Sequence, residues 1–266
     1  MRTASVILLF VFSFTVTHAL GSDALVLLLE SRGSELLKKA TVKGRSNSQA
    51  VYARFAKLVA AELEEAGHEE TAIRITRVIE NPGRYEIPRA EIAWITHTFA
   101  REFYQDEIIS RTGELIRFKT YATDLPNRFN PEFIEQKNYL RALAEELGLH
   151  YNDVDGFIQE IWIGEGEESF GIITHSDVQP VEETEWERDP WSGEVINGAL
   201  WGRGAVDDKG PIVAVMYGMR ALLDSGIPLK KKILLLVGTD EESANEDVST
   251  YLKTHSAPDQ TIVVDS

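Results

Sequence analysis

Four groups of side chains in the second half of the chain have the residue types that bind divalent metal ions. They are the H-S-D triplet at His175, Ser176 and Asp177, the adjacent acids Asp207 and Asp208, the pair Glu241 and Glu242, and Asp265. The chain contains no cysteine, so only imidazole and carboxylate groups could hold a zinc-type ion. These groups therefore predict a metal site made of histidine and acidic residues.

Each group taken alone also has an ordinary structural interpretation. An isolated H-x-D triplet is most often a surface histidine beside a capping aspartate. Asp207 and Asp208 lie shortly before Pro211, where acids commonly cap the start of a helix. Glu241 and Glu242 could form a solvated acidic loop. The metal-site hypothesis therefore depends on the fold bringing the groups together.

Within such a site the residue types divide the work. His175 could bind an ion through one ring nitrogen while Asp177 accepts a hydrogen bond from the other, which fixes the tautomer. Asp207 and Asp208 are adjacent carboxylates, which repel each other unless a cation holds one of them, and a carboxylate with two oxygens can bridge two ions. Of Glu241 and Glu242, one could coordinate metal and the other could act as general base on a water.

The predicted secondary structure places these groups at one edge of a sheet. Apolar runs predict strands over Phe170–Thr174, Ile233–Val237 and Thr261–Val264. His175 follows the first strand, Glu241 and Glu242 follow the second, and Asp265 follows the third. In an open α/β sheet, ligands bind outside the carboxyl ends of the strands. We therefore expect the groups to meet there.

Strands and helices alternate in this part of the chain. Helices are predicted over Glu132–Leu147, over Ile212–Leu223 and over Glu246–Lys253, and a further strand over Phe157–Ile163. This alternation predicts an α/β domain with a mainly parallel mixed sheet between helices. His150 and His255 are ligand candidates by residue type only, and His150 is expected to end a helix.

The N-terminal part has a different character. Residues 23–110 show helical periodicity, for example at Val51, Phe55 and Leu63, and carry no recognisable chemistry. His68 and His97 have no partners at ligand spacing, so we expect structural or surface roles. The predicted organisation is a signal peptide at 1–19, a helical segment at 23–110 and a catalytic region at 111–266.

The extreme N-terminus predicts export. Arg2 precedes an uncharged run at Val6–Val16, and Thr17–Ala19 has the small-x-small pattern of a cleavage site. The run is shorter than the roughly 20 residues that span a bilayer, so a retained anchor is the less favoured alternative. We expect cleavage after Ala19 and a periplasmic or secreted protein, with no membrane association after cleavage.

The charge balance limits the partners. The chain has 27 Lys and Arg residues against 43 Asp and Glu residues, a net charge of -16. Such a negative surface repels phosphate backbones, so we expect no nucleic acid partner. Nucleotide binding through Gly202-Arg-Gly204 is also disfavoured, because the segment lacks the third glycine of a dinucleotide motif and the lysine placement of a P-loop.

The motifs in their order resemble a known enzyme family. H-S-D-V-Q-P-V, W-x-x-D-P-W, G-A-L-W-G-R-G-A-V-D-D-K-G-P and G-T-D-E-E-S resemble the dinuclear zinc aminoacylase/carboxypeptidase family of metallopeptidases. Within that family they look most like the bacterial Xaa-His type dipeptidases. The resemblance covers roughly Leu115–Ser266 and leaves the helical segment unexplained.

The resemblance implies a role for each candidate residue. His175 and Asp265 would bind one Zn²⁺, Asp207 would bridge to a second Zn²⁺, and Glu242 would bind the second. Asp177 would orient His175, and the peptide bond between Asp207 and Asp208 would be cis. Glu241 would be the general base toward a water bridging the two ions. Mn²⁺ or Co²⁺ are alternative metals.

The implied activity is hydrolysis of dipeptides or short peptides. An aspartate at position 265 resembles the dipeptidase branch, whereas the deacylase branch typically has glutamate there. An N-acyl amino acid deacylase on the same scaffold is the alternative enzyme, and a non-catalytic metal-binding remnant is the alternative without turnover. The residues do not indicate the preferred dipeptide or the oligomeric state.

Two departures from the family pattern bear on activity. The family completes the second zinc site with a histidine beyond this region, and no histidine follows His255 here. The family's lid or dimerisation domain is also not found in the sequence. The resemblance therefore implies the N-terminal part of a longer, here truncated, enzyme, and predicts weak or no activity of this chain by itself.

Overall fold

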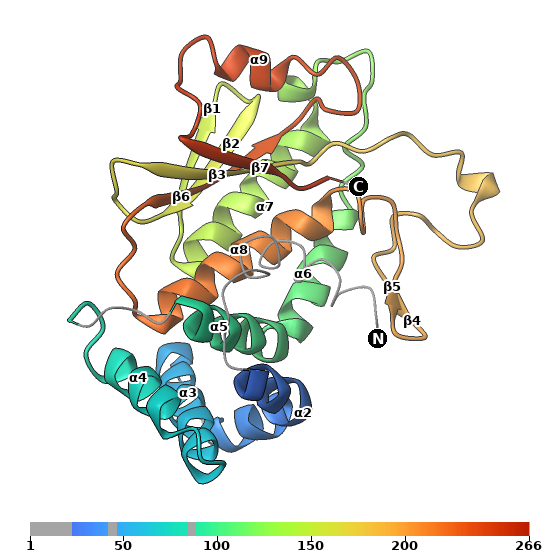
Figure 1. The fold of residues 1–266 in the computed structure, drawn as a ribbon. Helices are drawn as coiled ribbons and strands as arrows, with labels where there is room; N and C mark the ends of the chain where they lie inside the picture. Colours follow the sequence, from blue (N-terminus) through green and yellow to red (C-terminus); the bar gives the residue numbers. More distant parts are fainter. Residues whose placement is uncertain (1–22, 42–46, 85–88, 266) are drawn as a thin grey trace. The chain divides into compact units, whose positions relative to one another are not determined.

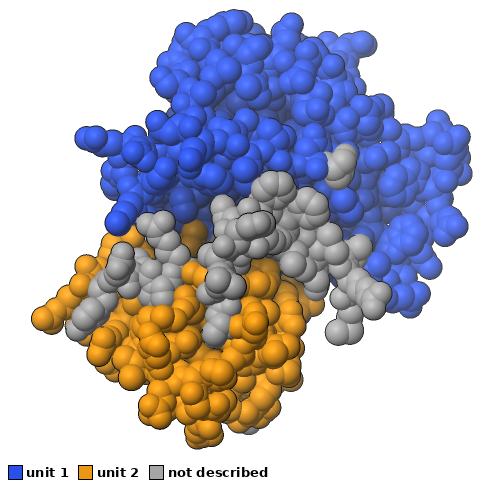
Figure 2. Space-filling model, viewed as in Figure 1, with its two compact units in different colours: residues 1–8, 106–219, 229–266 blue, residues 9–105, 220–228 orange. Residues whose placement is uncertain are grey.

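A computed structural model describes residues 23–41, 47–84 and 89–265. Among them, residues 106–219 and 229–265 form one compact unit, and residues 23–105 with 220–228 form another, coloured separately in Figure 2. The predicted signal peptide lies outside the described residues. No helix in the described ranges combines the length and apolar content that a membrane span requires.

The unit at the N-terminal end is helical, as the periodicity predicts. It contains α2 (Asp23–Ala40), α3 (Ser48–Glu65), α4 (Glu69–Glu80) and α5 (Arg89–Phe103). Asn47 caps α3 by accepting a hydrogen bond from the backbone N–H of Gln49 at 2.9 Å. The apolar face of α3 is fully buried, including Val51, Phe55 and Leu63.

Aromatic rings fill the centre of this helical unit. Phe99 of α5 is completely buried. Its ring centroid lies 5.2 Å from that of Tyr52, which meets it edge-on, and 4.8 Å from that of Phe103, which stacks on it. The Tyr52 hydroxyl and the Thr96 hydroxyl form a buried hydrogen bond of 2.9 Å. The aromatic residues of this segment therefore serve packing.

The other unit combines helices with a five-stranded sheet (Figure 1). Its helices are α6 (Gln105–Ile116), the 3₁₀ turn η1 (Asn127–Phe129), α7 (Pro131–Leu147), α8 (Lys209–Ser225), the 3₁₀ turn η2 (Glu183–Glu185) and α9 (Asp247–Tyr251). The strands are β1 (His150–Val154), β2 (Ile158–Ile163), β3 (Ser169–His175), β6 (Lys232–Gly238) and β7 (Gln260–Val263). Residues 220–225 of α8 group with the helical unit.

The sheet has the order β1-β2-β6-β3-β7. Strand β3 is parallel to both β6 and β7, with Ile172 opposite Leu235 on one side and Ile262 on the other. Strand β2 is antiparallel to β6 and to β1. Four of the five strands therefore point the same way, which confirms the predicted α/β class with a mainly parallel mixed sheet.

Apolar side chains alternate between the two faces of the sheet, as the strand period of two requires. On one face Ile158, Leu234 and Leu236 pack with Tyr251 of α9. The neighbouring positions Leu235 and Val237 are also fully buried. Figure 1 shows α9 on one side of the sheet and α7 and α8 on the other. The sheet is thus a central layer whose strand ends can carry polar loops.

Local signals fix the helix that precedes the sheet. The Asn130 side chain accepts from the backbone N–H of Glu132 at 3.0 Å, Pro131 occupies the first turn, and α7 ends at Gly148 with φ +71°. Only glycine adopts this conformation at low cost, so the helix stops where the sequence predicts. Helix α8, in contrast, begins at Lys209, before the predicted start at Ile212.

Two strand pairings were not predicted. His150 was expected to end a helix, but it begins β1, and its ring stacks on Trp162 with centroids 5.1 Å apart. The short hairpin of β4 (Val195–Ile196) and β5 (Ala199–Leu200) was also missed. Strand β1 depends on pairing with β2 rather than on an apolar pattern of its own. The hairpin instead has a local turn signal, Asn197-Gly198, and both of these residues adopt positive φ.

Candidate metal centre

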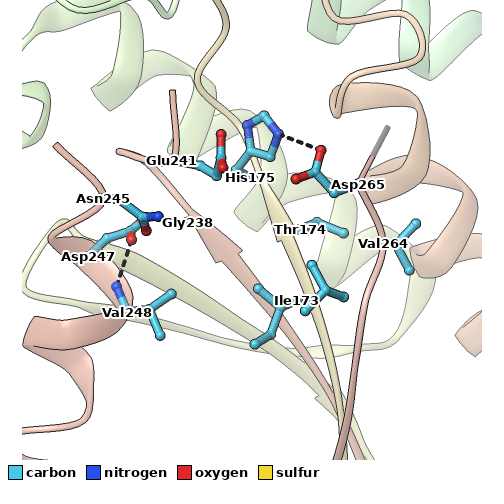
Figure 3. Close-up of a pocket in the computed structure, with 11 residues that line it drawn as sticks. Ile173, Thr174, His175, Gly238, Glu241, Asn245, Asp247, Val248, Val264 and Asp265 are labelled. Carbon is cyan, nitrogen blue, oxygen red and sulfur yellow. Dashed lines mark hydrogen bonds and ion pairs between the residues drawn. The ribbon is translucent and has the colours of Figure 1, made fainter. Parts of the chain in front are cut away.

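The loops at the carboxyl ends of β3, β6 and β7 converge, as the sequence predicts. His175 is the last residue of β3, and the N–H and hydroxyl of Ser176 both donate to the Gly238 carbonyl at 2.9 Å. Beyond β7, the N–H of Val264 donates to the Ile173 carbonyl at 2.9 Å. Figure 3 shows His175, Glu241 and Asp265 gathered at this edge. The backbone therefore places the predicted residues side by side.

The side chains are close enough to share metal ions. His175 Nε2 lies 3.0 Å from Asp207 Oδ1 and 3.6 Å from Asp265 Oδ1. Potential ligand atoms within 4.8 Å of one another form two groups among the described residues: His175 with Asp207 and Glu242, and His175 with Glu241 and Asp265. The structure thus brings together all four predicted metal-binding residues and the predicted base, with His175 common to both groups.

Asp177 contacts His175 differently from the expectation. The ring Nδ1 is 3.0 Å from the main-chain carbonyl of Asp177 and 3.5 Å from its carboxylate. The carboxylate instead accepts hydrogen bonds from the backbone N–H groups of Glu241, at 3.3 Å, and Glu242, at 2.9 Å. Asp177 therefore directs Nε2 of His175 toward the acids through its backbone and ties down the Glu241–Glu242 loop through its side chain.

Asp207 and Asp208 stand immediately before α8 and have different environments. The peptide bond between them is cis, as the resemblance implies. The Asp207 side chain is 35% exposed and faces His175. The Asp208 carboxylate is completely buried and accepts from the backbone N–H of His175 at 3.2 Å. Asp208 thus supports the end of β3, a role that the adjacent pair of acids does not reveal in the sequence.

Two buried atoms at the centre of the site have the character of metal ligands. Nε2 of His175 and Oδ1 of Asp207 have no hydrogen-bond partner among the described residues. A buried polar atom without a partner costs free energy, on the order of 1–3 kcal/mol. An imidazole nitrogen and a carboxylate oxygen are donors that Zn²⁺ and related ions accept. The residues present therefore fit a divalent metal ion.

The charges point to the same conclusion. Burial alone would lower the pKa of His175, but the hydrogen bond with Asp177 and the carboxylates of Asp208 and Asp207 raise it to about 10. Burial also raises the pKa of Asp208 to about 9. The pKa of Asp207 is raised by burial and by the charges of Glu242 and Asp265, against the opposing effect of His175. A bound cation would relieve this crowding of acids.

The adjacent glutamates differ in how they are held. The carboxylate of Glu242 accepts from Gln179 Nε2 at 2.7 Å. The carboxylate of Glu241 accepts no hydrogen bond within the described ranges. Its pKa is raised by partial burial and by the nearby charges of Asp265 and Glu242, although His175 opposes the shift. A free carboxylate with a raised pKa suits proton transfer, whereas a fixed carboxylate suits coordination.

One acid that the sequence analysis did not single out supports the loop that carries Glu241 and Glu242, which we call the glutamate loop. Asp247 is buried, and its Oδ2 accepts from the backbone N–H groups of Thr239, at 2.8 Å, and Asp240, at 3.1 Å. It also lines the pocket beside His175 and Glu241 in Figure 3. Because an acid at the start of a helix normally signals a cap, the sequence offers no sign of this second task.

The two remaining candidate histidines lie elsewhere. The His255 ring stacks on Tyr251, with centroids 4.5 Å apart, and its Nδ1 is 2.9 Å from the Thr254 hydroxyl. His150 belongs to β1. Neither histidine is part of a potential metal-binding group among the residues that the structure describes.

Comparison with protein families gives an independent result. Residues 171–262 match the model of the Peptidase family M20/M25/M40. The Bacillus subtilis protein named "Putative dipeptidase YtjP" is 34% identical over 158 residues, which cover 58% of this chain and 34% of that protein. The Staphylococcus saprophyticus protein named "Putative dipeptidase SSP1012" is 31% identical over 160 residues, which cover 59% of this chain and 34% of that protein. The predicted family resemblance is therefore confirmed over this part of the chain.

Solved structures give the same fold. Human carnosine dipeptidase 1 superposes with a TM-score of 0.53 at 20% identity, covering 62% of this chain and 39% of that one. The Saccharomyces cerevisiae dipeptidase Dug1p superposes with a TM-score of 0.56 at 18% identity, covering 63% and 40%. This chain spans about a third of the length of the curated relatives it matches.

Proposed function

We propose, from the premise that residues 171–262 form part of an M20 peptidase domain, that the protein is a zinc-dependent dipeptidase. One observation carries the proposal: the buried His175 Nε2 lies 3.0 Å from Asp207 Oδ1, and carboxylate oxygens of three further acids lie within 4.8 Å of a His175 ring nitrogen. The names of the relatives support the substrate class.

In this proposal His175, Asp207, Glu242 and Asp265 hold two zinc ions. His175 and Asp265 would hold one ion, Glu242 would hold the other, and the Asp207 carboxylate would contribute to the same centre. When bound, such ions lower the pKa of water and polarise the scissile carbonyl. Mn²⁺ and Co²⁺ accept the same donors and are alternatives.

Glu241 is the proposed acid–base residue. Its carboxylate has no hydrogen bond to give up and lies within 4.8 Å of the ligand atoms of His175 and Asp265. It takes a proton from the attacking water and returns it to the leaving amine. The raised pKa of Glu241 favours the first of these transfers, since a weaker acid has a stronger conjugate base.

Asp177 supports both partners in the proposed reaction. Its carbonyl holds the His175 ring, and its carboxylate holds the backbone of Glu241 and Glu242. The proposed substrate is a dipeptide or short peptide, because an aspartate at position 265 resembles the dipeptidase branch of the family. An N-acyl amino acid deacylase and a non-catalytic metal-binding protein are the competing proposals.

A substrate panel separates these proposals. The purified chain is loaded with zinc and supplied with dipeptides and, separately, with N-acetyl amino acids, and released amino acids are measured. Slow release from dipeptides that stops on chelation supports the dipeptidase. Preferential release from N-acetyl substrates would favour the deacylase. Zinc uptake without turnover of any substrate would overturn the hydrolase proposal for this chain and favour the non-catalytic alternative.

We also propose that the protein is exported and cleaved after Ala19. The supporting pattern is the basic Arg2, the uncharged run Val6–Val16 and the small residues flanking His18. Expression in a bacterial host with fractionation and intact-mass analysis tests this. A periplasmic or medium fraction with a mass starting at Leu20 is expected, and a cytoplasmic protein that keeps Met1–Ala19 would contradict it.

A further inference from the structure

The side chain of Gln179 makes two contacts with the same residue across the site. Its Nε2 donates to the main-chain carbonyl of Glu242 at 3.1 Å and to the Glu242 carboxylate Oε2 at 2.7 Å. An amide nitrogen carries two hydrogens, so both bonds can form at once. Gln179 lies in the exposed loop after β3, four residues beyond His175. This arrangement links a surface amide directly to a candidate metal ligand.

Glu242 is consequently held at three points by one short segment. Asp177 Oδ2 accepts from its backbone N–H at 2.9 Å, while Gln179 holds its carbonyl and its carboxylate. The neighbouring Glu241 has only the backbone contact to Asp177, at 3.3 Å. The loop that begins at His175 therefore fixes the second glutamate and leaves the side chain of the first free.

We propose that Gln179 is a positioning residue that fixes the Glu242 carboxylate as a metal ligand beside Asp207. The amide holds Oε2 of Glu242, and a carboxylate oxygen of this residue lies within 4.8 Å of the ligand atoms of His175 and Asp207. Hydrogen bonds to ligating carboxylates orient them, and their loss typically lowers metal affinity by about 10–100-fold. This inference rests on the metal centre of the proposed function.

The neutrality of the glutamine is important for this role. A lysine or arginine at position 179 would also bond to Glu242, but its positive charge would compete with the ion for the same carboxylate. An amide donates the hydrogen bonds and leaves the negative charge of Glu242 for the metal. Gln179 can therefore set the direction of the carboxylate without neutralising it.

Zinc titration of the full chain by calorimetry tests the inference, with Co²⁺ visible spectra as a second readout. Gln179→Met keeps length and shape but removes both donors. We expect it to weaken binding at the Glu242 ion by roughly 10–100-fold and to change the Co²⁺ bands, while the other ion binds as in the wild type. The thermal midpoint of the metal-free protein should not change, because Gln179 is exposed.

The control is Gln260→Met, the same substitution at an exposed glutamine of β7 that accepts from Lys231 at 3.5 Å. It should bind zinc as the wild type does. In a Glu242→Gln background, Gln179→Met should have no further effect, because the residue acts through Glu242. If Gln179→Met lowered zinc affinity as much in the Glu242→Gln background as in the wild type, the inference would be overturned.

The outcomes separate this inference from the function on which it rests. If the wild type binds zinc and Gln179→Met binds it equally well with unchanged Co²⁺ bands, Gln179 has no positioning role although the metal centre stands. If the folded wild type binds no zinc at all, the metal centre itself fails, and the role of Gln179 fails with it.

Discussion

The carboxylate of Asp177 accepts the backbone N–H of Glu242 at 2.9 Å. Its other oxygen accepts the N–H of Glu241 at 3.3 Å, and the whole residue is only 1% exposed. One buried side chain thus joins the segment after β3, directly beyond His175, to the loop after β6, which carries both glutamates. The relative placement of the candidate ligands depends on this contact.

Replacing Asp177 should therefore affect both stability and metal binding. Asp177→Ala leaves two backbone N–H groups without their acceptor, and we expect a loss of about 1–3 kcal/mol in the free energy of unfolding. Asp177→Asn keeps one oxygen and should lie between alanine and the wild type. Urea unfolding and zinc titration measure the two effects. An alanine variant with wild-type zinc affinity would show that the loops hold their positions without this contact.

Glu241→Gln should separate binding from catalysis. The carboxylate accepts no hydrogen bond among the described residues, so an isosteric amide should leave folding and the binding of both ions nearly unchanged. Any zinc-dependent hydrolysis should fall by about 10²–10⁴-fold, the usual contribution of a general base. Calorimetry and amino acid release measure the two properties on one preparation. Loss of zinc binding along with turnover would assign Glu241 to coordination instead.

Gly238, at the end of β6, leaves room for Asp247. A Cβ atom at position 238 would lie 2.3 Å from Asp247 Oδ2, too close for the two atoms to coexist. Gly238→Ala should push Asp247 away from Thr239 and Asp240, disturb the glutamate loop, and cost about 1–3 kcal/mol of unfolding free energy. Because the glutamate loop carries candidate metal ligands, Gly238→Ala should also lower the zinc affinity.

Asp247→Ala serves as the comparison, because it removes the carboxylate without crowding the strand. If Gly238→Ala acts through Asp247, adding Asp247→Ala to it should change zinc affinity little further. Fully additive losses would mean that the two residues support the site independently.

Buried His97 should make the helical unit sensitive to mild acid. Burial, with a smaller effect of Arg101, lowers the pKa of His97 to about 4, below the ordinary value of 6.5. At a pH between these two pKa values, His97 binds a proton in the unfolded chain but stays neutral in the folded chain. The stability is therefore fully present above pH 6.5 and falls as the pH drops toward 4, by up to roughly 3 kcal/mol.

Thermal or urea unfolding across this pH range, compared with His97→Gln, measures the effect. The variant should lose less stability than the wild type between pH 6.5 and pH 4, whatever its stability at neutral pH. Parallel curves for the two proteins would mean that His97 titrates alike in the folded and unfolded states.

The strands that carry the site were predicted within one or two residues. The apolar runs at 170–174 and 233–237 correspond to β3 and β6, because buried parallel strands need continuous apolar sequence. The run at 261–264 corresponds to β7, which is a mostly exposed strand at the edge of the sheet. The convergence of His175, Glu241 and Asp265 followed from the rule that ligands gather at the carboxyl ends of such strands. The strands themselves are thus encoded by local apolar runs, and the site follows once these strands lie parallel in one sheet.

Apart from the β4–β5 hairpin, the missed features depend on the tertiary structure. Strand β1 has polar side chains at His150, Asn152 and Asp153, and its conformation comes from pairing with β2. The contacts of Gln179 and Asp247 require the loops to be folded before either residue has a partner. The sequence suggested that Asp177 orients His175, but only the structure reveals that its carboxylate holds the glutamate backbone.

Zinc stoichiometry is the most direct test of the central claim that His175 anchors a metal centre at this sheet edge. His175 belongs to both potential ligand groups, whereas His255 stacks on Tyr251 outside them. Equilibrium dialysis followed by elemental analysis compares the wild type with His175→Ala and His255→Ala. We predict that the wild type and His255→Ala bind zinc equally and that folded His175→Ala binds none tightly. A His175→Ala protein that retains wild-type zinc, or a folded wild type without zinc, would contradict the account.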